Sequence, residues 1–219
     1  AQEKRAKPFQ IEQLKQVIFW LEQSIASSRL NGNVADELRY TRDKSLLLLG
    51  FWRGFRGDEL TRLQIEHVEL VPNEGMVCYF PQTKGDRQLK GSSFKAPMLS
   101  QLCPVTAYIE WIELAQLTSG SVFRSVSRSG KIGDNGLHPD SLIPLLRTLF
   151  TNAGIASPMQ YSGHSLRRGF ASWATSNGWD LKMLMEYVGW KNVHSAMRYI
   201  ESADPFAQHR IETMLITEA

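Results

Sequence analysis

The chain has 219 residues, of which 42% are hydrophobic and 21% charged, and its formal net charge is +3. This composition excludes a disordered chain, and the length suits one principal domain with its own buried core. The two cysteines, Cys78 and Cys103, have no CxxC spacing, and His67 and His138 have no metal-ligand spacing, so neither a disulfide framework nor a zinc site is expected.

Apolar residues recur with helical period through the first quarter of the chain. This pattern predicts helices at 10–28, 34–52 and 58–63. The apolar residues at 46–49 lie on all sides of the predicted helix, which is typical of a helix at the centre of a domain. Because the longest apolar stretch, 45–52, is far shorter than the ~20 residues that span a bilayer, we expect no membrane contact and a cytoplasmic location.

A small antiparallel sheet is predicted next, embedded among helices. Its strands lie at 65–70, 76–80 and 93–98, with a turn at 72–75 and a hairpin at 83–86 that contains Lys84. Further helices are predicted at 104–117, 139–153, 163–177, 180–187, 193–200 and from about 205 onward. The predicted fold class is therefore mainly α with a small antiparallel β-sheet, an α+β arrangement.

The basic residues gather in groups instead of spreading evenly. The groups are Arg42, Arg53, Arg56 and Arg62; then Lys84, Arg87, Lys90 and Lys95; and then Arg124, Arg128 and Lys131. Such clusters suit the phosphate backbone of a nucleic acid, and they are equally compatible with ordinary solvated faces.

The strongest chemical signal is formed by SGHSLRRGFA at 162–171 and VGWKNVHSAMRYI at 188–200. His164 and Arg167 are three residues apart, so on a helix both side chains project from one face and can converge on one small anion. The polar, glycine-containing break at 176–178 allows the chain to fold back and bring Tyr199 to the same place. This arrangement is typical of a site that attacks a phosphodiester.

Displacement at phosphorus adds negative charge to the non-bridging oxygens, and proteins neutralise it with metal ions or with guanidinium groups. Metal ligands at suitable spacing are missing from the sequence, so neither a metal nor another cofactor is expected. Arg56, in GFRGDEL, and Arg167 are the candidates for a bidentate grip on one phosphate. Glu59 is predicted to orient Arg56 from three residues away, with an ordinary surface ion pair as the alternative.

Tyr199 is the candidate nucleophile, and a core or rim tyrosine is the alternative. A free phenol has a pKa of about 10, so it needs a proton acceptor or nearby positive charge, which His164 and the arginines would supply. Lys84 is the candidate proton donor to the departing 5′-oxygen, with an ordinary turn lysine as the alternative. Trp190 is expected either to donate its indole N–H to a phosphate oxygen or to pack beside the Tyr199 helix.

These residues, in this order, resemble the catalytic signature of the tyrosine recombinase family, also called phage integrases. The resemblance runs from Arg56 to Tyr199, and SGHSLRRGFA and GWKNVHSAMRYI are its most specific parts. It implies the fold of the DNA breaking-rejoining enzymes, in which Arg56 and Arg167 would grip the scissile phosphate and His164 would assist proton transfer. Lys84 would be the general acid, and Tyr199 would form a 3′-phosphotyrosyl intermediate.

The family's chemistry implies a site-specific DNA recombinase or integrase that works without ATP or metal. The implied partner is double-stranded DNA with paired recombination sites, bound by a homo-oligomer, expected to be a tetramer, whose isolated domain is a monomer. Many members have histidine where Trp190 stands, which leaves a proton-transfer role for this position open. The apolar tail from 205 is expected to dock on a neighbouring protomer or on its own domain.

Members of the family usually carry an N-terminal helical domain that binds the core of the DNA site. Nothing in 1–219 resembles that domain, and the charged start at Ala1, without methionine, is interpreted as a domain boundary. We therefore expect 1–219 to be the catalytic domain alone.

Three rival functions are weighed against this one. A type IB topoisomerase would share the fold and the nucleophile but relax supercoils. A non-catalytic DNA-binding accessory protein would have no need of the complete residue set. An RNA-directed phosphotransferase is disfavoured because no aromatic-rich sheet motif for stacking bases is visible.

Overall fold

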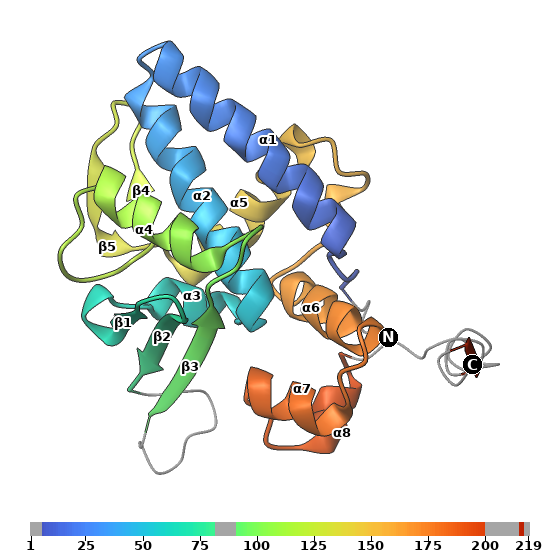
Figure 1. The fold of residues 1–219 in the computed structure, drawn as a ribbon. Helices are drawn as coiled ribbons and strands as arrows, with labels where there is room; N and C mark the ends of the chain where they lie inside the picture. The colour runs from blue at the N-terminus through green and yellow to red at the C-terminus, as the bar shows by residue number, and fades with distance from the viewer. Residues whose placement is uncertain (1–5, 82–90, 200–214, 217–219) are drawn as a thin grey trace.

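The structure, a computed structural model, describes residues 6–81, 91–199 and 215–216 (Figure 1). Its helices are α1 (Ile11–Leu30), α2 (Val34–Arg53), α3 (Gly57–Arg62), α4 (Pro104–Leu114), α5 (Pro139–Asn152), α6 (Ser165–Ser176), α7 (Leu181–Val188) and α8 (Val193–Met197). Its strands are β1 (Val68–Val71), β2 (Gly75–Phe80), β3 (Ser92–Pro97), β4 (Arg124–Val126) and β5 (Ile132–Gly136). The predicted α+β fold, mainly helical with small antiparallel sheets, is confirmed.

Helix α2 is the centre of the fold, as its apolar patch predicts. Leu46, Leu47, Leu48 and Leu49 are at most 1% exposed, because α1, α4 and α6 pack around α2 (Figure 1). The helix ends at Gly54, which has a φ of 59° in the left-handed region that favours glycine. This stop turns the chain so that Arg56 becomes the N-cap of α3.

The three-stranded antiparallel sheet has the order β1-β2-β3. On β2, Met76, Cys78 and Phe80 face the core in alternation with more exposed residues, and Cys78 lies opposite Phe94 of β3. The predicted start of the first strand is wrong, since 65–67 form a 3₁₀ turn, η1 (Ile65–His67). In this turn the Val68 N–H donates back to the Ile65 carbonyl, while the Ile65 N–H donates to the distant Gly120 carbonyl at 2.8 Å, beside an isolated antiparallel bridge between Gln64 and Ser121.

A second hairpin, β4–β5, is not predicted by the sequence pattern. Val126 lies opposite Ile132, and a register irregularity interrupts the pairing near Arg124. These strands are short and mostly polar, so they carry little of the alternation that marks a strand.

At the other end, α8 stops at Met197 instead of at 200. The predicted hairpin at 83–86 lies outside the described residues, as does the last predicted helix except for 215–216.

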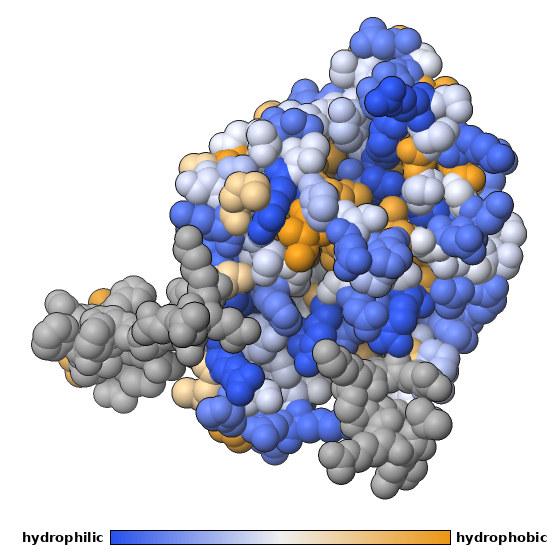
Figure 2. Space-filling view, turned by 180° about the vertical axis from the view of Figure 1, so that it is seen from behind, coloured by the Kyte–Doolittle hydropathy of each residue, from blue (hydrophilic) through white to orange (hydrophobic). Residues whose placement is uncertain are grey.

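The surface shown in Figure 2 is mainly hydrophilic, with smaller apolar patches between the polar residues. The large apolar side chains that are exposed include those of Phe19, Leu30 and Met159, as is usual for a folded domain. No helix in the described part of the chain is both long enough and apolar enough to cross a bilayer.

A buried ion pair links α2 to the β4–β5 hairpin. Arg42 donates to Asp43 Oδ1 through Nε (2.9 Å) and Nη2 (2.8 Å), and through Nη1 to the carbonyl of Arg124 (3.0 Å). Both side chains are nearly buried. Burial raises the pKa of the Asp43 carboxyl above its ordinary value, and the Arg42 guanidinium opposes that rise. The arginine is therefore what makes an ionised carboxylate tolerable at this position.

Replacing Arg42 by methionine is expected to lower the free energy of unfolding by about 3–5 kcal/mol, because it leaves a buried carboxylate without its partner. Urea denaturation at neutral pH, followed by circular dichroism, measures the change. The control is Arg39→Met, which breaks the more exposed pair between Arg39 and Asp36 and is expected to cost less than about 1 kcal/mol. Equal losses for the two variants would contradict this account of the pair.

Candidate active site

Glu59 lies between the two arginines that the sequence singles out. On α3 its carboxylate accepts the main-chain N–H of Arg56 at 2.6 Å, and its Oε1 lies 3.8 Å from Arg56 Nη1. Its other oxygen, Oε2, lies 3.4 Å from Nη2 of Arg167 on α6. Glu59 is only 5% exposed, so the alternative of a surface ion pair is wrong. One buried carboxylate orients both guanidinium groups.

Arg167 is also fixed from its other side. Its Nε donates to the carbonyl of Gly54 at 2.5 Å, and the residue is 2% exposed. Burial lowers the pKa of the Arg167 guanidinium, while the Glu59 carboxylate raises it. Arginine side chains stay protonated in folded proteins near neutral pH, so the positive charge is kept. A fixed cation thus lies where the end of α2 meets α6.

A close helix contact sets the position of α6. The Phe9 N–H donates to the Ser165 carbonyl at 3.0 Å. A Cβ atom on Gly169 would lie only 1.7 Å from the Phe9 carbonyl oxygen, so only glycine allows this approach. The contact anchors the first turn of α6, and with it His164 and Arg167, against the segment that precedes α1.

Tyr199 lies among three of the predicted residues. Its hydroxyl is 3.0 Å from Nδ1 of His164, the N-cap residue of α6. Its ring stacks on the Trp190 ring, with centroids 5.1 Å apart and planes 22° apart. Cζ of Arg167 lies 5.7 Å from the centroids of both rings. The structure therefore brings His164, Arg167, Trp190 and Tyr199 together, although they come from three separate segments.

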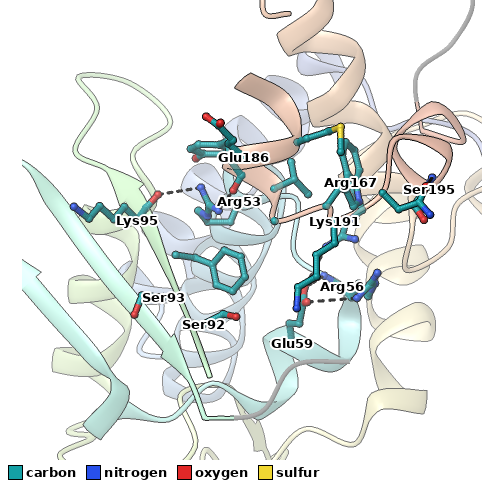
Figure 3. Close-up of a pocket in the computed structure, with 17 residues that line it drawn as sticks. Arg53, Arg56, Glu59, Ser92, Ser93, Lys95, Arg167, Glu186, Lys191 and Ser195 are labelled. Atoms are coloured by element: carbon teal, nitrogen blue, oxygen red, sulfur yellow. Dashed lines mark hydrogen bonds and ion pairs between the residues drawn. The ribbon is translucent and has the colours of Figure 1, made fainter. Parts of the chain in front are cut away.

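An open cleft of about 660 Å³ lies beside this cluster (Figure 3). Its charged lining comprises Arg53, Arg56, Lys95, Arg167 and Lys191 with Glu59 and Glu186. Cations therefore outnumber anions on its walls, which suits an anionic ligand such as a phosphate group. Lys191, whose only sequence signal is its place beside Trp190, extends toward Arg56 and Glu59 in Figure 3.

The structure bears on one of the two expectations stated for Trp190, that of packing. Its ring packs beside Tyr199, and the residue also lines the cleft. Its indole N–H is buried without a hydrogen-bond partner among the described residues. Packing is thus confirmed, and donation of the indole N–H to a phosphate oxygen stays a prediction.

Two arginines of the first basic group do not face solvent. Arg42 forms the ion pair described above, and Arg53 is 2% exposed. Arg53 donates to the carbonyls of Lys95 on β3 and Tyr187 on α7, and its Cζ lies 3.7 Å from the centroid of the Tyr187 ring. This group is therefore not, as a whole, a solvent-facing cluster: Arg42 is held in its ion pair, and Arg53 lines the cleft but is itself almost fully buried. Arg53 instead ties two walls of the cleft together, and its place at the end of the apolar run LLLLGFWR is the signal for its burial.

Lys84, the predicted general acid, lies outside the described residues. Within the ranges that are described, no three His, Cys, Asp or Glu side chains are grouped as metal ligands would be. The site residues placed by the structure are thus Arg56, Glu59, His164, Arg167, Trp190 and Tyr199.

Comparison with known sequences points to one group of proteins. The model of the phage integrase family matches residues 23–205. An integrase/recombinase xerD homolog of Selenomonas ruminantium is 30% identical over 181 residues, which cover 82% of this chain and 52% of that protein. The type 1 fimbriae regulatory protein FimB of Escherichia coli K12 is 26% identical over 163 residues, 74% of each chain. This chain thus spans about half the length of the xerD homolog.

Solved structures show the same fold at lower identity. XerA recombinase has a TM-score of 0.65 and 20% identity, over 96% of this chain and 66% of its own. XerH site-specific recombinase bound to its difH substrate has a TM-score of 0.62 and 17% identity, over 90% of this chain and 50% of its own. At such identities the likeness establishes the fold, and function has to be argued from the site.

Proposed function

This chain belongs to the phage integrase family, and on that premise we propose that it is the catalytic domain of a site-specific DNA recombinase. It would cleave and rejoin DNA strands through a 3′-phosphotyrosyl intermediate. One observation carries the proposal: the Tyr199 hydroxyl lies 3.0 Å from His164 Nδ1, and Arg167 Cζ lies 5.7 Å from the centroid of the same phenol ring. A proton acceptor and a fixed cation beside a phenol are what a tyrosine nucleophile needs.

In the proposed reaction, the Tyr199 oxygen attacks the scissile phosphorus while its proton passes to His164 Nδ1. A bond from phosphorus to the tyrosine oxygen forms as the bond to the 5′-oxygen breaks. The 5′-oxygen takes its proton from Lys84, so the products are a 3′-phosphotyrosyl ester and a free 5′-hydroxyl. Since one phosphate diester replaces another, a 5′-hydroxyl from a partner strand reverses the step without ATP.

Arg56 and Arg167 are proposed to hold the non-bridging oxygens of the scissile phosphate. Glu59 contacts both arginines, so their guanidinium groups are oriented before the substrate arrives. Donors oriented in advance stabilise developing charge without the cost of reorganising during the reaction. Trp190 is proposed to hold the Tyr199 ring by stacking and to offer its indole N–H to a phosphate oxygen.

We propose double-stranded DNA with paired recombination sites as the substrate, bound by four copies of the protein, with the isolated domain a monomer. The cationic cleft supports a phosphate-rich partner. The XerH neighbour, whose structure contains its difH substrate, supports DNA in particular.

The test is covalent capture on nicked duplex DNA. The probe is a library of randomly nicked duplex fragments from the DNA that flanks the encoding gene. A nick near the cleaved bond releases a short strand and so prevents rejoining. We expect adducts that survive denaturing detergent, and proteolysis followed by mass spectrometry should place the nucleotide on Tyr199.

Absence of adducts, despite salt-sensitive DNA binding, would overturn the proposal in favour of a non-catalytic DNA-binding protein. Adducts at many unrelated sequences, together with relaxation of supercoiled plasmid, would favour the topoisomerase instead.

A further inference from the structure

Arg168, the residue after Arg167, contacts the chain next to Tyr199. Its Nη1 donates to the main-chain carbonyl of Arg198 at 3.1 Å. Arg168 is 8% exposed, whereas Arg198 is an exposed residue, so the contact is partly buried. The bond links residues 30 positions apart and joins α6 to the peptide unit that leads into Tyr199.

The backbone before Tyr199 has few other restraints among the described residues. Helix α8 ends at Met197, and Tyr199 is held by a single turn in which its N–H donates to the Ala196 carbonyl at 2.9 Å. Carbonyl groups at the end of a helix have no partner within the helix. The guanidinium of Arg168 satisfies one such carbonyl, that of Arg198, just after the last helical turn.

The helical period explains why one helix, α6, can contact both the hydroxyl and the backbone of Tyr199. His164, Arg167 and Arg168 are spaced i, i+3 and i+4, so they share one face of α6. His164 contacts the hydroxyl of Tyr199, and Arg168 contacts the peptide unit before it. Trp190 stacks on the ring between these two points.

We propose that Arg168 is a positioning residue for the nucleophile. This inference rests on the proposed function and adds a residue to the predicted catalytic set. Through the Arg198 carbonyl, Arg168 fixes the backbone of Tyr199 relative to α6, so the phenol oxygen stays within reach of both His164 and the phosphate held by Arg167. Loss of this bond leaves the chemical groups in place but lets the tyrosine backbone move. Misplacement of a reacting group by about 1 Å can cost on the order of 10²-fold in rate.

The experiment compares Arg168→Met, which removes the donor, with Arg168→Lys, which keeps a cationic N–H donor. The first readout is hydrogen exchange of the DNA-free protein, in peptides that cover 193–199 and α6. The second is the rate of covalent cleavage at saturating protein, on a nicked duplex recovered by the capture experiment. The third is the affinity for the same duplex in a Tyr199→Phe background. Arg39→Met, which removes an arginine-to-carbonyl bond to Ser127 away from the cleft, is the matched control.

For Arg168→Met we expect faster exchange at 196–199, unchanged exchange in α6 and cleavage slower by about 10- to 100-fold. DNA affinity should stay within about twofold, Arg168→Lys should recover most of the rate, and Arg39→Met should match the unsubstituted protein. Unchanged exchange at 196–199, an equal loss in the lysine variant, or a loss of DNA affinity as large as the loss of rate would overturn the inference. If Arg168→Met does not fold, Arg168→Leu, which also lacks a donor, takes its place under the same criteria.

The exchange readout separates this inference from the proposed function. If the unsubstituted protein forms no adduct, the recombinase proposal fails. Hydrogen exchange at 196–199 still decides whether Arg168 holds the Tyr199 backbone.

Discussion

Replacing Tyr199 by phenylalanine is expected to abolish covalent capture of DNA, a loss on the order of 10³-fold or more. The substitution removes one oxygen atom, which is the atom that would attack phosphorus. In the structure that oxygen contacts His164 at 3.0 Å, while the ring is held by stacking on Trp190. Phenylalanine keeps the stacking surface, so the fold and the cleft should remain.

The measurement is the yield of detergent-resistant adduct on a nicked duplex, with DNA binding measured in parallel. Tyr40→Phe is a matched control because Tyr40 lies on α2 and packs edge-on against Trp20. It should leave adduct formation unchanged. Adducts that persist in the Tyr199→Phe variant would show that another residue is the nucleophile.

Replacing Arg167 by lysine is expected to lower the cleavage rate by about 10²- to 10³-fold, as removal of an oriented charge donor typically does. The Arg167 guanidinium bonds to the Gly54 carbonyl through Nε and to Glu59 through Nη2. A lysine ammonium cannot reproduce this planar fork while also gripping a phosphate with two parallel donors. The lysine keeps the positive charge, but it loses the fixed direction of the guanidinium hydrogen-bond donors.

Single-turnover cleavage at saturating protein measures this effect, and thermal unfolding reports whether the variant folds. Arg29→Lys is the control, since Arg29 is an exposed residue on α1 that pairs with Glu37, and its cleavage rate should not change. A near-normal rate for a folded Arg167→Lys variant would refute the bidentate grip.

The two substitutions test different parts of one arrangement. Arg167 is proposed to hold the phosphate from a position set by Glu59 and Gly54, whereas Tyr199 is set by His164, Trp190 and, as we infer, Arg168. Because Cζ of Arg167 also lies 5.7 Å from the Tyr199 ring centroid, the two effects are expected to be non-additive. A double variant should therefore lose less than the product of the separate losses.

Much of the fold was predictable because its signals are local. The period of α2, the alternation on β2 and the breaks near 31–33 and 54–57 each depend on a few neighbouring residues. The hairpin β4–β5 and the 3₁₀ turn η1 were not predictable, since short polar segments carry little period and Ile65 bonds to the distant Gly120. Local patterns report which faces of an element are apolar, not which remote carbonyl completes its hydrogen bonds.

The candidate site also has a part that local sequence signals could predict and a part that they could not. Sequence order, spacing and a family resemblance singled out Arg56, His164, Arg167 and Tyr199 as candidates, because an i, i+3 pair and a motif are properties of neighbouring residues. They did not reveal that Glu59 reaches Arg167 across 108 positions, that Arg42 and Arg53 are buried, or that Arg168 holds the Arg198 carbonyl. The sequence shows that an arginine is present, but it does not show whether the side chain faces water or a carbonyl oxygen.

The sequence by itself therefore determined the kind of protein this is: its α+β class, its family and the residue types of its site. Only the tertiary structure decided how those residues act on one another. The burial of a side chain and its hydrogen-bond partners depend on segments that meet only after folding. The energy of a charged side chain depends in turn on the groups around it.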